Sequence, residues 1–118
     1  MRRGEVYWAN LLPRSGPEQK GRRPVVVVSH DAFNRSAGWR TAIIVPVSTS
    51  SAQAQRGPTV VPMPSGSGGL PRSSLALCHQ VTTLDRSKLE RRLGLLSADL
   101  MREIAIGLAS AMDLETGG

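Results

Sequence analysis

A run of four valines at residues 25–28, preceded by Pro24, constrains the fold of this chain more than any other feature. Four β-branched residues in a row are too few for a helix, and an apolar run of this length is typical of a strand buried on both faces. Proline has no backbone N–H, so Pro24 can open such a strand but cannot occupy its middle. Residues 24–29 are therefore predicted to form a central strand, with Arg22 and Arg23 at its entrance.

Five further segments are rich in strand-forming residues and are separated by short polar or Pro/Gly-containing stretches. These predicted strands cover residues 5–11, 41–49, 59–63, 73–84 and 89–96. Pro46 predicts a bulge or an edge position inside its strand. Residues 30–38 are expected to form one short helical turn, and residues 50–58 a polar loop.

The last segment has the pattern of a long amphipathic helix. Ser97 is a favourable N-cap, and Asp99 follows in the first turn, where a negative charge is stabilised. The predicted apolar stripe consists of Leu100, Ile104, Leu108 and Met112, widened by Met101, Ala105 and Ala111. The fold class is therefore mainly β with helices (α+β): a small sheet or barrel with a C-terminal helix, in one domain over residues 1–118.

The charge of the chain is strongly positive and unevenly distributed. Residues 1–96 carry fourteen Lys and Arg against five Asp and Glu, and thirteen of the fifteen cationic residues of the chain are arginine. The guanidinium group binds phosphate through paired hydrogen bonds, so a polyanionic partner is one explanation. A genome rich in G and C is the other, and composition alone leaves both open.

The only cysteine, Cys78, excludes an intramolecular disulfide. The N-terminus lacks the apolar stretch of a secretory signal and no apolar run could span a membrane, so a reducing cytoplasm is expected. With His30 and His79 the chain has too few ligands for a typical zinc site, and neither a metal nor a cofactor is predicted. The two histidines form a minor candidate pair for acid–base chemistry on RNA.

A stronger constellation joins the ends of two predicted strands. If residues 24–29 and 41–49 pair antiparallel, Arg23 lies beside the hydroxyls that begin at Ser48, with Glu18 and Gln19 on the preceding loop. Guanidinium and hydroxyl groups on rigid strands suit a phosphodiester. On this pattern alone a structural explanation is favoured, since arginines beside an apolar strand can prevent aggregation and serine runs are ordinary in loops.

The order of segments changes that balance. "RRGEVYWANL", "GPEQKGRRPVVVVSHDAFN", "IIVPVSTS" and "SSLALCHQVTTLDRSKLERRLGLLS", followed by a helix, together resemble the MazF/PemK family of toxin endoribonucleases over nearly the whole chain. The resemblance implies a small SH3-like β-barrel of the MazF/CcdB type, with a C-terminal helix, that forms homodimers. It also implies metal-independent cleavage of single-stranded RNA without a cofactor, and inhibition by a cognate MazE-like antitoxin with an acidic, partly apolar tail.

The resemblance also assigns residues. The family's catalytic arginine matches Arg23, and its catalytic threonine matches Ser48, where the hydroxyl is kept and Thr49 is a possible substitute. Glu18 matches an acidic residue near the family's active site, and Glu18, His30 and His79 are the alternatives for the general base. His79 stands where many relatives carry Asp or Glu, which puts base recognition there in doubt. RNA contacts are expected from a wider set: Gln19, Arg22, His30, Ser50, Gln53, Gln55, Arg56 and Gln80.

The aromatic residues are predicted chiefly to pack, with Phe33 and Trp39 as candidates for stacking on bases. Two alternative functions stay open. One is a gyrase poison of the CcdB type on the same fold, and the other is an RNA-binding barrel without catalysis. An Arg23–Ser48 phosphate site argues against the gyrase poison, which needs none.

Overall fold

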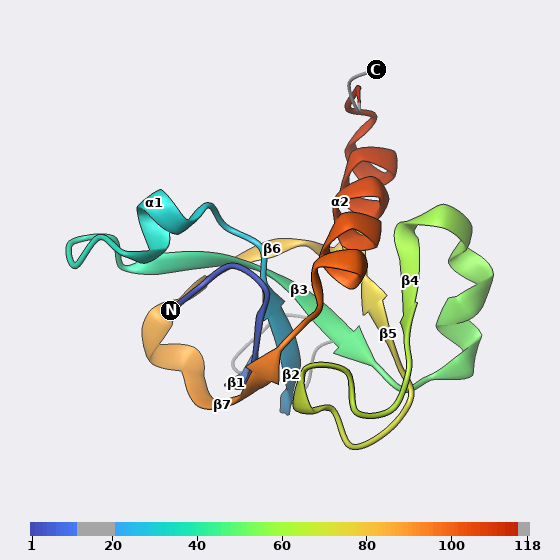
Figure 1. Ribbon diagram of the computed structural model, residues 1–118, viewed down its shortest axis with the longest axis horizontal. Helices are drawn as coiled ribbons and strands as arrows, with labels where there is room; N and C mark the ends of the chain where they lie inside the picture. The colour runs from blue at the N-terminus through green and yellow to red at the C-terminus, as the bar shows by residue number, and fades with distance from the viewer. Residues whose placement is uncertain (12–20, 116–118) are drawn as a thin grey trace.

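The computed structural model describes residues 1–11 and 21–115, without the side chains of Ser51, Gln53, Gln55 and Arg56. The described residues form one antiparallel sheet, short 3₁₀ turns and two α-helices (Figure 1). The strands are β1 (Glu5–Asn10), β2 (Arg22–Val27), β3 (Thr41–Ser48), β4 (Val60–Met63), β5 (Ser74–Leu77), β6 (Thr82–Asp85) and β7 (Leu89–Leu95). The helices are α1 (Asp31–Asn34) and α2 (Ala98–Met112), and the 3₁₀ turns are η1 (Ser51–Thr59), η2 (Ser67–Gly69), η3 (Cys78–Gln80) and η4 (Arg86–Lys88). The predicted α+β class is confirmed.

The sheet divides around β3. Its strand order is β4-β5-β3-β2-β1-β7, and β6 pairs with the first half of β3 while β5 pairs with its end. The prediction of one strand over residues 73–84 is therefore wrong, because η3 separates β5 from β6. The polar loop expected over residues 50–58 is also largely η1. In the described part of the chain, no helix is long and apolar enough to cross a membrane.

Pro24 of β2 and Pro46 of β3 lie where the missing N–H costs no hydrogen bond between these two strands. Val28 donates to the Ile43 carbonyl, so alternation turns the backbone groups of Pro46 away from β2. On its other side, β3 pairs with β6 up to Ile44 and with β5 from Val47 onward. The backbone of Pro46 faces the gap between these two pairings. The bulge or edge predicted for Pro46 is therefore wrong, because the split of the sheet accommodates it. Pro24 likewise precedes the first β2–β3 pair.

The valine strand is buried on both faces, as predicted. Val26 belongs to a core cluster that includes Ile104 of α2, whereas Val25 and Val27 belong to a second cluster with Ile44. All three valines are fully buried. Fully burying a side chain of this size contributes about 1.5–3 kcal/mol, so β2 is a rigid element on which neighbouring side chains are held in place.

Helix α2 begins as predicted, with the Ser97 hydroxyl accepting from the Leu100 N–H at 3.2 Å. Its buried face includes Met101 and Ile104, but Ala105 and Met112 are exposed, so the prediction fails for these two. A repeat of four advances about 40° per step around a helix of 3.6 residues per turn, which carries Met112 off the buried face. Gly107 lies on the buried face instead, where α2 packs closely on Cys78 of η3: a Cβ at Gly107 would be 2.8 Å from Cys78 Sγ.

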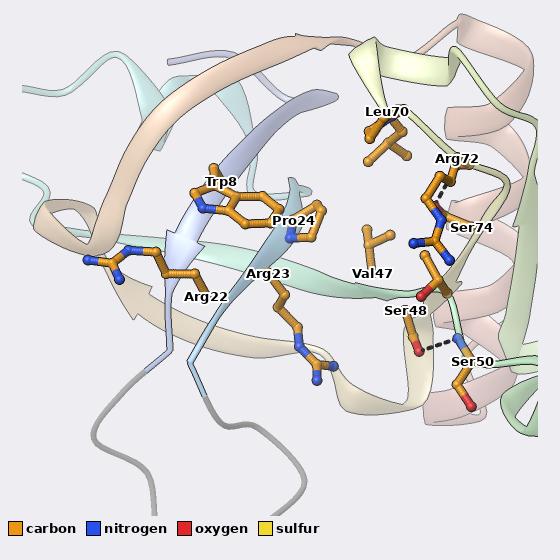
Figure 2. A pocket seen from close by; sticks show the side chains of 12 residues that line it. Trp8, Arg22, Arg23, Pro24, Val47, Ser48, Ser50, Leu70, Arg72 and Ser74 are labelled. Carbon is orange, nitrogen blue, oxygen red and sulfur yellow. Dashed lines mark hydrogen bonds between the residues drawn. The ribbon is translucent and has the colours of Figure 1, made fainter.

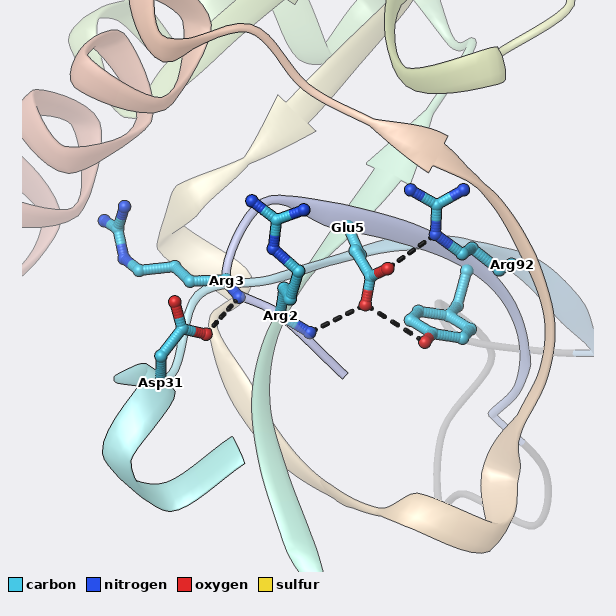
Figure 3. Close-up of polar contacts among 6 residues, drawn as sticks. Arg2, Arg3, Glu5, Asp31 and Arg92 are labelled. Atoms are coloured by element: carbon cyan, nitrogen blue, oxygen red, sulfur yellow. Dashed lines mark hydrogen bonds and ion pairs between the residues drawn. The ribbon is translucent and has the colours of Figure 1, made fainter. Parts of the chain in front are cut away.

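Glu5 is a buried carboxylate that joins β1 to β7 (Figure 3). It accepts from Arg92 Nε at 2.5 Å, from the Arg2 N–H at 2.7 Å and from the Tyr7 hydroxyl at 3.2 Å. Burial raises the pKa of Glu5, but these hydrogen bonds and the Arg92 charge outweigh burial and hold the pKa below its ordinary 4.5.

This arrangement predicts an acid-sensitive contribution to stability. A carboxyl whose pKa is lower in the folded state stabilises fully above its unfolded pKa, and the contribution is lost as pH falls through the folded value. Unfolding free energies of the wild-type chain should therefore decrease as the pH falls below about 4.5, and Glu5→Gln should remove part of that decrease. Equal pH slopes for the two proteins in denaturant titrations at pH 3–7 would contradict the assignment.

Candidate functional site

Arg23 and Ser48 lie at adjacent strand ends on the same side of the sheet. The β2–β3 register pairs Val25 with Pro46, and continuing it by two residues places Arg23 opposite Ser48. Residues opposite one another in antiparallel strands project to the same face. Figure 2 shows the Arg23 guanidinium and the Ser48 hydroxyl directed toward the same space. The structure thus brings together the two residues that the sequence analysis linked.

These two residues line a pocket of about 450 Å³, called here the Arg23 pocket. Its apolar wall is formed by Trp8, Pro24, Val47, Leu70 and Pro71, and its polar side by Arg22, Arg23, Ser48, Thr49, Ser50, Arg72 and Ser74. Among the described residues, three arginines and no carboxylate line it. Such a pocket attracts an anion, and its apolar wall lowers the local screening of the charges.

Arg72 is a component of the pocket that the sequence analysis missed. It belongs to the segment between η2 and β5, and Figure 2 shows its guanidinium directed toward Ser74 and Ser48. The Ser74 hydroxyl donates to the Arg72 carbonyl at 2.8 Å, which fixes the backbone there. Residues 64–71, directly before Arg72, have the composition of a flexible Gly/Ser connector, and the pairing of Met63 with Ser74 brings Arg72 beside the end of β3. No sequence signal marks Arg72.

The Ser48 hydroxyl is already oriented. Ser48 Oγ accepts from the Ser50 N–H at 3.0 Å, so its own O–H is left to donate toward the pocket. Ser48 is half-buried, whereas Thr49 is exposed. Of the two hydroxyls between which the sequence analysis left a choice, Ser48 is the better ordered.

Arg22 lines the pocket but directs its charge elsewhere. Its Nε donates to Glu90 Oε1 at 2.6 Å, and the ion pair raises the pKa of Arg22. Figure 2 shows the Arg22 side chain extending to the opposite side of β2 from Arg23. Because both Arg22 and Glu90 are well exposed, this pair contributes little stability.

The two histidines are separated from each other along β3. His30 lies near the start of β3, where its Nδ1 accepts from the Ala32 N–H at 2.9 Å and caps α1. His79 lies in η3, toward the other end, with Nδ1 3.3 Å from the Thr59 hydroxyl. The structure therefore does not support a catalytic pair of imidazoles, and it places His30 away from the Arg23 pocket. Gln80 follows His79 and does not line the pocket either.

Other candidate residues are excluded or lie outside the described residues. Glu18 and Gln19 fall in residues 12–20, and the side chains of Gln53, Gln55 and Arg56 are likewise outside the description. Burial raises the pKa of Cys78 to about 11, so its thiol is protonated near neutral pH and is a poor nucleophile. The described residues contain no group of three or more His, Cys, Asp or Glu side chains placed to hold a metal ion.

Comparison with known proteins gives the family. A model of the PemK-like, MazF-like toxins of type II toxin–antitoxin systems matches residues 2–112. The chain belongs to this toxin family. It is 37% identical over 112 residues to a protein named endoribonuclease MazF6 from Mycobacterium tuberculosis, covering 95% of this chain and 96% of that one. It is 34% identical to endoribonuclease MazF from Staphylococcus saprophyticus, covering 98% and 94%.

Solved MazF structures share the fold. MazF from Deinococcus radiodurans superposes with a TM-score of 0.78 at 30% identity, covering 97% of each chain. A mycobacterial endoribonuclease in complex with its cognate antitoxin gives a TM-score of 0.75 at 26% identity, covering 99% of this chain and 97% of that one. The predicted resemblance to the MazF/PemK family is confirmed, and the Arg23 pocket belongs to a chain of this toxin fold.

Proposed function

We propose that this chain is an endoribonuclease toxin that cleaves single-stranded RNA at the Arg23 pocket. The observation that carries the proposal is the convergence of Arg23, Arg72 and the Ser48 hydroxyl around a space with an apolar wall. Two guanidinium groups and a hydroxyl donor match the charge and geometry of one phosphodiester. The endoribonuclease names of the relatives support RNA as the substrate.

The proposed reaction is transesterification. The 2′-oxygen of the scissile nucleotide forms a bond to its own 3′-phosphorus, and the bond from phosphorus to the 5′-oxygen of the next nucleotide breaks. The 2′-OH proton passes to a base, the leaving oxygen takes up a proton, and the products end in a 2′,3′-cyclic phosphate and a 5′-OH. Nucleophile and leaving group both belong to the RNA, and the proposed reaction uses no metal ion or cofactor, as the family resemblance implies.

The arginines act on the charge that develops at the phosphorus. Arg23 stands on the rigid valine strand, so its position costs no reorganisation during the reaction, and its fork donates to the non-bridging oxygens. Arg72 approaches the same oxygens from the opposite wall, and Ser48 donates a further hydrogen bond. Glu18 is retained as the candidate base from the family resemblance, with Thr49 as the alternative hydroxyl to Ser48.

The proposal extends to assembly and control. We infer that the toxin is a cytoplasmic homodimer and that a MazE-like antitoxin inhibits it with an acidic, partly apolar tail. Such a tail complements a pocket that three arginines and an apolar wall line. The structures of related MazF chains with MazE or a cognate antitoxin support inhibition by a bound partner.

Cleavage with mapped ends tests the proposal. Purified protein incubated with RNA in EDTA is expected to give 2′,3′-cyclic phosphate and 5′-OH ends. A substrate with 2′-deoxyribose at the mapped scissile nucleotide is expected to stay intact, because its nucleophile is missing. If the natural RNA stays intact, the proposal of endoribonuclease activity is overturned. If the substrate with 2′-deoxyribose is cleaved, the proposed transesterification mechanism is overturned.

Arg72 gives a further prediction. Arg72→Ala is expected to lower kcat/KM for RNA cleavage by roughly 10–100-fold, since one charged donor to the transition state is removed at an exposed position. Arg72→Lys should recover only part of the activity, because an ammonium group lacks the paired donors. A kcat/KM equal to that of the wild type in Arg72→Ala would show that the pocket works without this arginine.

A further inference from the structure

Two aromatic side chains are exposed side by side at the far end of β3 from Ser48. Phe33 of α1 is 43% exposed and Trp39 is 46% exposed. Their rings stack with centroids 4.7 Å apart and an interplanar angle of 24°, and His30 meets the Phe33 ring edge-on at 6.2 Å. Trp39 stacks on Phe33 and is nevertheless 46% exposed, so part of its ring surface is open to solvent. The prediction that Phe33 and Trp39 chiefly pack is met only in part, because they pack on each other while both stay exposed.

This pair is called here the aromatic platform. Polar contacts anchor α1, which carries Phe33, and Trp39 lies in the following turn, where its N–H donates to the Ser36 carbonyl at 3.1 Å. Asn34 is 3% exposed and bonds Ser29 twice, accepting from its hydroxyl at 2.6 Å and donating to its carbonyl at 2.8 Å. Asp31 accepts from the Arg3 N–H at 2.7 Å, which ties α1 to the N-terminus (Figure 3). Arg86 donates to the Phe33 carbonyl at 2.7 Å.

Positive charge surrounds the platform. Arg35 ends α1, Arg40 follows Trp39, and the backbone N–H of Arg86 donates to the Arg40 carbonyl at 2.9 Å. The nearby carboxylates already accept hydrogen bonds inside the protein. Asp31 accepts from Arg3 and Asn34, and Asp85 accepts from the Ser87 N–H. Arg35, Arg40 and Arg86 still outnumber Asp31 and Asp85 around the platform, so the local formal charge is positive.

We propose that the aromatic platform is a second RNA-binding site, on which a base of the substrate stacks against Trp39 while Arg40 and Arg35 contact the flanking phosphates. Aromatic faces beside arginines are the usual means of holding single-stranded nucleic acid without reading its sequence. The proposal rests on the proposed function only in taking RNA as the ligand.

The platform lies too far from the Arg23 pocket to share a nucleotide with it. At about 3.3 Å per residue, the seven steps from Thr41 to Ser48 span about 23 Å. Single-stranded binding sites on small barrels extend over about 4–16 nucleotides. To occupy both places, an RNA strand must continue several nucleotides beyond the scissile bond, so short substrates are not expected to reach the platform.

Length-dependent binding tests the proposal. The probes are fully 2′-O-methylated oligonucleotides of 5 and 15 nucleotides, which lack the attacking hydroxyl, so binding is measured without cleavage. Trp39→Ala is expected to weaken binding of the 15-mer by about tenfold, in keeping with the loss of one stacked base, and to leave the 5-mer unchanged. Trp39→Phe should retain most of the affinity because it keeps an aromatic face.

Ile106→Ala, which removes an exposed apolar side chain on α2, is the control and should change neither affinity. If Trp39→Ala perturbs folding in thermal melts, Arg40→Gln replaces it. That variant should reduce the slope of log K against log salt by about 0.7 for the 15-mer.

Unchanged 15-mer binding in both Trp39→Ala and Arg40→Gln would overturn the proposal that the aromatic platform binds RNA. The same conclusion would hold if these variants weakened only the binding of an antitoxin. Equal losses for both lengths would also overturn it. Failure of RNA cleavage with these binding results intact would overturn the proposed function instead.

Discussion

Arg23→Ala is expected to lower kcat/KM for RNA cleavage by about 10²–10³-fold, the effect of removing one preorganised donor to a developing oxyanion. The loss should fall mainly on kcat, because the guanidinium contacts charge that grows between the ground state and the transition state. Single-turnover cleavage of a mapped RNA in EDTA measures the chemical step directly. Arg23→Lys should remain strongly impaired, since a single ammonium cannot reproduce the fork.

Neighbouring arginines provide the controls for this result. Arg22→Ala should cost less than tenfold, because its guanidinium is paired with Glu90 on the other side of β2. Arg91→Ala removes an exposed arginine of β7 outside the pocket and should leave cleavage unchanged. A loss in Arg22→Ala that matches or exceeds the loss in Arg23→Ala would contradict the assignment of the phosphate site.

Gly69→Ala is expected to lower the free energy of unfolding by about 3–5 kcal/mol, through left-handed strain and a steric clash that add together. Gly69 has φ +80°, and a Cβ there would lie 2.1 Å from the Leu93 carbonyl oxygen of β7. The obstructing atoms are backbone of a strand that is paired with β1, and they cannot move aside as a side-chain tip can. The close approach of η2 to β7 also carries the chain to Leu70 and Arg72, so the contact that stabilises the fold positions the pocket wall.

Two glycine variants separate the causes. Gly66 has φ +92° but no atom lies within 4 Å of the position that a Cβ would take, so Gly66→Ala should cost only the strain, about 1–2 kcal/mol. Gly94 faces the same contact from β7, where a Cβ would lie 2.6 Å from the Gly68 carbonyl, so Gly94→Ala should be strongly destabilising without a positive φ. Denaturant unfolding curves give all three values. Equal costs for Gly69→Ala and Gly66→Ala would exclude the steric clash.

Much of the site could be predicted because its parts are local. A β-branched run flanked by Pro24 specifies a strand through side-chain sterics, and an antiparallel neighbour then places Arg23 beside Ser48. Arg72 could not be predicted, because it follows a Gly/Ser-rich connector and its position depends on the pairing of β4 with β5. The pairing of the two histidines was a wrong expectation because it depended on strand positions that local patterns do not give. His30 follows β2 and His79 precedes β6, and the pairings of β2 and β6 with β3 place the two residues at different points along β3.

The sequence by itself determined where most of the strands lie, where α2 begins and the family to which the chain belongs, since these depend on side-chain shape, capping and the order of short motifs. The tertiary structure alone decided that the long predicted strand over 73–84 breaks at η3, that Pro46 occupies a central strand, and that Phe33 and Trp39 face solvent. Each of these depends on which backbone groups and surfaces meet across the sheet, and no local pattern encodes such long-range pairing.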